Sequence, residues 1–226
     1  MEGRTSPEFN GVWSDLGRKV LPSRRTSLII DPLDGRIPYR PDAPPYPVET
    51  FDDPEARPPS ERCLVWNEGP PMIPNGVTGH LQIVQTQGYV VIVNEMIHDA
   101  RIVPLDGRAH LPGFISRWTG DSRGRWEGDT LVVDTTNFNG STRVLQSTAA
   151  LQVVERFRRL DDYTLSYTFA VTDVATYIRP WTAEMVMTRT DTPLFEYACH
   201  EGNYSLANIL SGARAVERSS GASVPK

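Results

Sequence analysis

The distribution of proline restricts the possible folds of this chain more than any other feature. Most of its nineteen prolines precede His80. Proline fixes φ and lacks a backbone N–H, so long helices and central strands are unfavourable in this part of the chain. The same part carries Trp13 and Trp66, which disordered segments usually lack. We therefore expect residues 1–79 to form an ordered wrapping segment that belongs to the same domain as the rest.

From His80 onward the sequence changes to short runs rich in Val and Ile, separated by turn residues. Such runs are typical of half-buried β-strands. The expected strands and hairpins cover residues 80–87, 88–108, 126–138, 150–173 and 181–203, with turns at Gln87-Gly88, Asp161-Asp162 and Asp191-Thr192-Pro193.

After these strands, apolar residues at helical spacing predict a short helix over residues 205–217, and residues 218–226 read as a frayed tail. A succession of antiparallel strands closes most readily into a barrel, because closure removes the sheet edges. We expect an all-β core over residues 80–217, either an antiparallel lipocalin-like barrel or a strongly curved sheet. The proline-rich segment would wrap this core.

Charge and hydropathy exclude some classes of function. The chain of 226 residues has a net charge of −5, with a pI of about 5.4, and no basic stripe of the kind that binds nucleic acid. It has no apolar run long enough to span a membrane, and its first residues lack the apolar core of a signal peptide. Residues 2–9, EGRTSPEF, are compatible with a vector-derived start, in which case a natural leader has been removed.

Strand periodicity assigns side chains to the two faces of the sheet. In residues 94–102, the face with Asn94, Met96, His98, Ala100 and Ile102 is the more apolar, so we place it inside. The opposite face holds Glu95, Asp99 and Arg101, which we expect to form an outer row of ion pairs. In residues 151–157, Glu155 shares its face with apolar residues and is expected to point inward.

These assignments yield one candidate catalytic pair, the inward His98 and Glu155. A histidine titrates near neutral pH, and a buried glutamate suits a general acid. The candidate substrate-binding residues around this pair are Arg101, Trp118, Arg125, Tyr167 and Tyr197. The alternative is a His–Glu hydrogen bond inside a solid core.

The stretch GDSRGRWEGD, residues 120–129, contains residues that favour tight turns. We interpret it mainly as turn structure. The functional alternative is a loop at the barrel mouth, from which Arg123 or Arg125 would hold an anionic substrate.

Three functions remain open. The first is a cofactor-independent lyase, isomerase or cyclase that acts by acid–base chemistry on a small hydrophobic organic molecule. The sequence has no GxSxG, HExxH, GxGxxG or P-loop motif. The second is a non-catalytic, lipocalin-like carrier of a small ligand, and a homo-oligomer is possible in either case. The third is a metal-dependent enzyme, which would have to bring together His80, His98, His110 and His200 from distant positions.

Long strings of the sequence are similar to a large group of uncharacterised bacterial proteins that are usually exported. These strings are GYVVIVNEMIHDARIVPLDGR, GDSRGRWEGDTLVVDTTNF, VVERFRRLD and YACHEGNYSLANILSGAR, and the resemblance covers roughly residues 60–217. The group implies no particular activity. It does imply a periplasmic or secreted location, although the cytoplasm stays open. Residues alone leave Cys63 and Cys199 as free thiols or as a bridge, and export favours the bridge.

Overall fold

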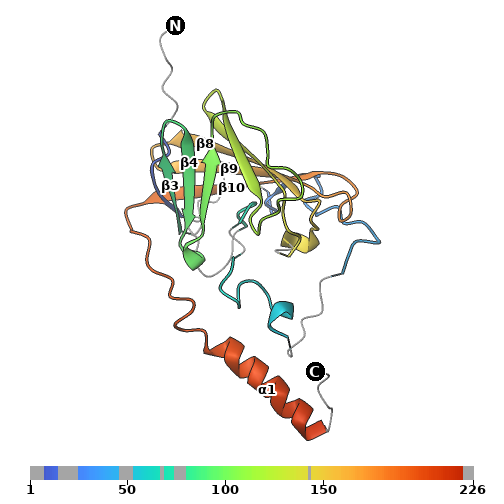
Figure 1. The fold of residues 1–226 in the computed structure, drawn as a ribbon. Coiled ribbons are helices and arrows are strands. Elements are labelled where there is room, and N and C mark those ends of the chain that lie inside the picture. The colour runs from blue at the N-terminus through green and yellow to red at the C-terminus, as the bar shows by residue number, and fades with distance from the viewer. Residues whose placement is uncertain are drawn as a thin grey trace.

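In the computed structural model, ten strands form one antiparallel sheet, followed by a single C-terminal helix (Figure 1). The structure describes residues 8–14, 25–45, 53–66, 69–73, 80–141 and 144–220. The strands are β1 Gly11–Ser14, β2 Ile29–Asp31, β3 His80–Gln85, β4 Tyr89–Asn94, β5 Ala100–Pro104, β6 Asp121–Glu127, β7 Thr130–Thr136, β8 Gln152–Asp161, β9 Thr164–Thr172 and β10 Trp181–Thr190. The short 3-10 helices are η1 Pro54–Ala56, η2 Met96–His98 and η3 Val144–Gln146, and the helix is α1 Tyr204–Ser220.

The strand order is β5-β4-β3-β1-β10-β9-β8-β7-β6, and β2 also pairs with β10. Most sequence neighbours are paired as hairpins, as the turn residues predict. β1 is an exception to our expectation for the proline-rich segment, because it lies between β3 and β10. Its four residues contain no proline, so every backbone N–H can enter a ladder. Trp13 on β1 is fully buried in the core.

The two end strands of this order, β5 and β6, lie close together, although no ladder joins them in the described part of the chain. Gly124 on β6 makes this approach possible. A Cβ built at Gly124 would lie 2.7 Å from Leu105 Cδ2 and 2.8 Å from Val103 Cγ1. The sheet is therefore strongly bent, with its concave side filled by a core that includes Phe157, Tyr167 and Trp181.

Two expected elements are different in the structure. Residues 121–127, interpreted as turn structure, form β6, which pairs along its whole length with β7. The turn is shorter and lies at Gly128, whose φ of +61° suits glycine. Residues 194–201, predicted as a returning strand, form no strand. The edge of β10 that such a strand would need is already paired with β1 and β2.

The chain beyond β10 is held by a disulfide between Cys63 and Cys199, which confirms the bridged alternative. The predicted helix is confirmed as α1, four residues longer than the 205–217 range and with no fully buried residue. Figure 1 shows α1 projecting away from the sheet. No described helix is both long and apolar enough to cross a membrane.

Candidate functional site

The turn between β4 and β5 determines which side chains of β5 point inward. Within η2, Ile97 and His98 have φ values of +60° and +54°, the left-handed region that non-glycine residues seldom occupy. This turn interrupts the alternation we had assumed through residues 94–102. On β5 itself Arg101 and Val103 are buried, whereas Ala100 and Ile102 are exposed.

The prediction that His98 points inward is therefore wrong. His98 is exposed at the end of η2, and its Nδ1 accepts a 3.5 Å hydrogen bond from the backbone N–H of Tyr197. It makes no pair with Glu155 among the contacts of the described residues. The expected outer position of Arg101 is wrong for the same reason.

Glu155 does point inward, and its partner is Arg101. Glu155 is fully buried at the centre of β8, and the side chain of Arg101 is 6% exposed. The guanidinium binds the carboxylate with two nitrogens: Nη2 donates to Oε1 at 3.0 Å and Nη1 donates to Oε2. This forked geometry is the strongest form of carboxylate contact that a side chain makes.

Tyr167 on β9 completes this buried network. Its hydroxyl donates to Glu155 Oε1 at 2.7 Å and accepts from the backbone N–H of Met72 at 2.9 Å. Met72 belongs to the proline-rich segment, so this segment contacts the network directly. We call Arg101, Glu155 and Tyr167 the buried triad.

Burial and charge shift the pKa values of two members of the triad, Tyr167 and Arg101. Burial, with the adjacent Glu155 carboxylate, raises the pKa of Tyr167 well above its usual value, so the phenol stays neutral. Burial alone would lower the pKa of Arg101, but the attraction of Glu155 outweighs it and the pKa is raised. The interior thus contains an ion pair and a neutral hydroxyl that donates a hydrogen bond.

Asp99 is a fourth titratable group on this side of β5. It is half-buried, and burial raises the pKa of its carboxyl, an effect partly offset by the positive charge of Arg101. Asp99 lies just before β5 in an extended conformation, two residues from Arg101, so the two side chains point to the same side. Sequence reasoning placed both on the outer face, and no periodicity signal could have corrected this, because the error arose in the turn.

Three of the seven candidate residues are thus brought together, and four are not. Arg125 is exposed on β6 and bound to Glu127. Trp118 is half-buried in the connection between β5 and β6. Tyr197 is half-buried with its ring 6.5 Å from that of Trp66. Arg125 and Tyr197 have other contacts, so their place in a site with Glu155 stays a prediction, as does that of Trp118.

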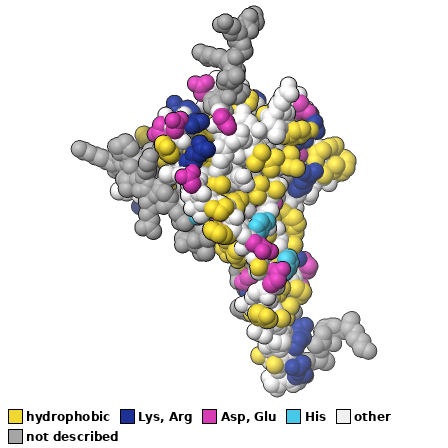
Figure 2. Space-filling view, turned by 90° about the vertical axis from the view of Figure 1, so that its left-hand side faces the viewer, with side chains coloured by type: hydrophobic (Ala, Val, Ile, Leu, Met, Phe, Trp, Pro, Cys, Tyr) yellow, Lys and Arg dark blue, Asp and Glu magenta, His cyan; other side chains and the backbone are white. Residues whose placement is uncertain are grey.

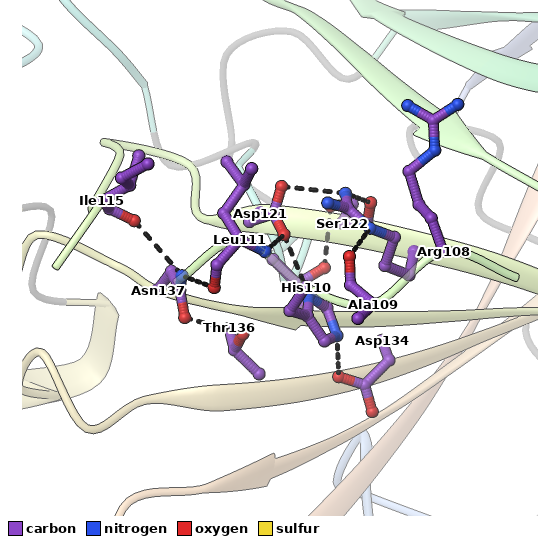
Figure 3. A network of polar contacts seen from close by, with 12 residues as sticks. Arg108, Ala109, His110, Leu111, Ile115, Asp121, Ser122, Asp134, Thr136 and Asn137 are labelled. Atoms are coloured by element: carbon purple, nitrogen blue, oxygen red, sulfur yellow. Dashed lines mark hydrogen bonds and ion pairs between the residues drawn. The ribbon is translucent and has the colours of Figure 1, made fainter. Parts of the chain in front are cut away.

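A second polar cluster lies on the outer face of β6 and β7 (Figure 3). His110 contacts two carboxylates: Nδ1 lies 3.0 Å from Asp121 Oδ2, and Nε2 lies 3.2 Å from Asp134 Oδ1. Asp121 also accepts from the backbone N–H of Leu111 and from Arg123. Burial opposes ionisation of Asp121, but these hydrogen bonds outweigh it and lower its pKa.

The connection between β5 and β6, residues 105–120, is also held to the sheet near its other end. The side-chain amide of Asn137 donates to the carbonyls of Leu111, Pro112 and Ile115 (Figure 3). The charged residues of the GDSRGRWEGD stretch and its continuation thus fasten residues 105–120 to the sheet. Both ring nitrogens of His110 contact carboxylates, one on β6 and one on β7.

The described residues contain no group of three or more His, Cys, Asp or Glu side chains placed to hold a metal ion. Of the other histidines proposed as ligands, His80 pairs with Glu95 at 2.8 Å and His200 is exposed. Comparisons with family models, with curated proteins and with solved structures find no match to this chain.

Proposed function

We propose that the protein is a cofactor-independent enzyme of lyase, isomerase or cyclase type that acts by acid–base chemistry on a small, mainly apolar organic molecule. The observation that carries this proposal is the buried triad beside Asp99. Ionisable groups in an apolar interior are costly, and they cluster at functional sites. We further propose that the bent sheet forms a lipocalin-like barrel and that the substrate binds where the half-buried Asp99 borders the filled core.

Each group has a distinct role in this proposal. Asp99 is the proton acceptor, because a carboxyl with a raised pKa is a stronger base than an ordinary one. Among the described residues, Arg101 bonds Glu155 with two of its five N–H donors, and we assign the other donors to a carbonyl or carboxylate oxygen of the substrate. Glu155 is reassigned from general acid to positioning residue, since it accepts from both Arg101 and Tyr167.

The reaction that fits these groups is removal of a proton from a carbon next to a carbonyl. Asp99 takes the proton, negative charge develops on the carbonyl oxygen, and the guanidinium of Arg101 stabilises that charge. Return of the proton at another carbon gives an isomerase, and loss of a neighbouring group gives a lyase. Closure of a ring by the same carbon gives a cyclase.

Deuterium incorporation tests this proposal with a panel of compounds, whatever the natural substrate is. Purified protein is incubated in D2O with small apolar ketones and unsaturated carboxylic acids, and exchange is followed by NMR. We expect at least one compound to exchange, and Asp99→Asn to reduce the rate about 100-fold or more. Asp129→Asn, a change at an exposed carboxylate in the β6–β7 turn, is the matched control and should exchange like the wild type. Equal rates in the wild type and Asp99→Asn would contradict the proposal.

A carrier function without chemistry is the second candidate, and the aromatic interior favours it. The rings of Phe157 and Tyr167 lie 4.9 Å apart, and those of Phe169 and Trp181 lie 5.8 Å apart. Carrier pockets are lined mainly by such side chains, with a few polar groups that orient the ligand. Compounds that bind but never exchange deuterium would support this candidate.

We also propose that the protein acts in the periplasm or outside the cell. The Cys63–Cys199 disulfide supports an oxidising compartment, where such bonds persist. The resemblance to exported bacterial proteins supports the same location.

A further inference from the structure

Part of the outer face of β3, β4 and β5 is apolar, although it is exposed. Val84, Val91 and Ile102 are aligned across the three strands by the ladder register. The next row holds Val93 and Ala100 beside the polar Gln82 of β3. Ile102 is 61% exposed and Val84 is 38% exposed. We call this surface the apolar outer face.

The outer face of β6, β7 and β8 has the opposite character. Arg125, Glu127 and Arg156 are exposed there, and Glu127 forms ion pairs with both arginines. An outer face that borders water normally has this polar composition. Contiguous apolar surface of the kind found on β3–β5 usually marks a contact with another macromolecule.

The same chain carries a second apolar surface, on α1. Leu206, Ile209, Leu210 and Ala213 lie on one side at helical spacing, and Val216 extends that side. None of these residues is fully buried, and Val216 is 66% exposed. A surface helix gains most of its stability by packing such a side against a partner.

The chain does not bring its own α1 onto its own apolar outer face. The segment before α1 passes the η2 end of β4, where the backbone N–H of Phe195 donates to Glu95. The disulfide then fixes Cys199 five residues before the helix begins. Figures 1 and 2 both show α1 directed away from the sheet, and Figure 2 shows hydrophobic side chains gathered on the side of the body where β3 and β4 lie.

We propose that α1 of one copy docks on the apolar outer face of a second copy, and that the contact is reciprocal in a two-fold dimer. The dimensions agree. A 17-residue helix is about 25 Å long and about 10 Å wide. Three strands span about 10 Å, and strands of five or six residues are about 17–20 Å long. One helix therefore covers the face.

Because the contact is reciprocal, the dimer buries two helices and two sheet faces. If each helix and each face loses on the order of 400 Å², the dimer buries on the order of 1,600 Å², the standard size for a specific interface. The centre of each face carries no charged side chain, so no ion needs to be desolvated there.

Sedimentation equilibrium on the full-length, oxidised protein tests the dimer with three equally exposed positions. Ile102→Asp alters the sheet surface, and Val216→Asp alters the helix. Ile178→Asp is the control, because Ile178 is 64% exposed in the β9–β10 connection and lies on neither surface. We expect the wild type and Ile178→Asp to dimerise alike, and each of the other two variants to weaken the dimer about tenfold or more.

Other outcomes overturn the proposal. A wild type that stays monomeric at all concentrations excludes the dimer. A dimer that Ile102→Asp weakens but Val216→Asp does not would join two sheets face to face, without the helix. Circular dichroism of each variant checks folding. Should Ile102→Asp fail to fold, Val216→Asp alone decides, because a substitution on an exposed helix side leaves the sheet intact.

Discussion

Removal of the Arg101 guanidinium should destabilise the protein severely, because it leaves the Glu155 carboxylate buried without its cation. In Arg101→Met the side chain keeps much of its length but loses both nitrogens that bind Glu155. Glu155 is fully buried, so water cannot replace them without opening the sheet. The only described side chain still bonded to it would be Tyr167.

The expected loss is about 3–5 kcal/mol, the usual result of breaking a buried ion pair. A domain of this kind has a total stability of about 5–15 kcal/mol, so this is a large part of it. Urea unfolding followed by the fluorescence of the five tryptophans measures the change in midpoint and slope.

A second substitution separates charge from packing. Adding Glu155→Gln to Arg101→Met removes the buried charge but keeps an acceptor for the Tyr167 hydroxyl. We therefore expect the double variant to be more stable than Arg101→Met, although Glu155→Gln alone destabilises the wild type. A loss below about 1 kcal/mol for Arg101→Met, typical of surface ion pairs, would refute the reasoning, as would a double variant less stable than the single one.

Three further predictions concern other parts of the molecule. The pKa of Asp99 is raised in the folded state, so ionisation of its carboxyl opposes folding as pH rises through that pKa. Asp99→Asn should therefore be more stable than the wild type at pH 7 in urea titrations. The gain should vanish below 3.8, the ordinary pKa of an aspartate. His110→Ala removes both carboxylate contacts and should speed amide hydrogen exchange in residues 105–120 while the β9 amides stay protected; unchanged exchange would show that His110 does not hold this segment. Replacing Cys63 and Cys199 by serine should cost about 2–4 kcal/mol in urea unfolding, and a reductant should reproduce the loss in the wild type but not in the variant.

Periodicity predicted the sheet best where strands are long and regular. Glu155, Tyr167 and Leu131 are buried as their alternation indicates, and all lie on strands of seven residues or more. Each of these strands is flanked by a hairpin partner in the sequence. Local pattern and tertiary pairing therefore agree there.

Prediction failed where the pairing partner or a turn decides the structure. Residues 121–127 have the glycine and charge of a turn, but Gly124 is required for the close approach of β5, and the charged side chains face outward. His98 was misplaced because the backbone is left-handed at both Ile97 and His98. This turn changes which residues of the next strand point inward, and composition does not reveal the change. A β-branched isoleucine is an uncommon residue for that conformation.

The triad itself shows why a buried site is harder to predict than a buried residue. Arg101 and Glu155 are 54 residues apart, and five strands lie between β5 and β8 in the sheet order. Only the bend of the sheet brings them into contact, and that bend is a property of all ten strands. Alternation can assign each side chain to a face, but the choice of partner for Glu155 depends on how the whole sheet bends. The inward glutamate was predictable from the sequence; its arginine is identified only by the close approach of β5 and β6 in the structure.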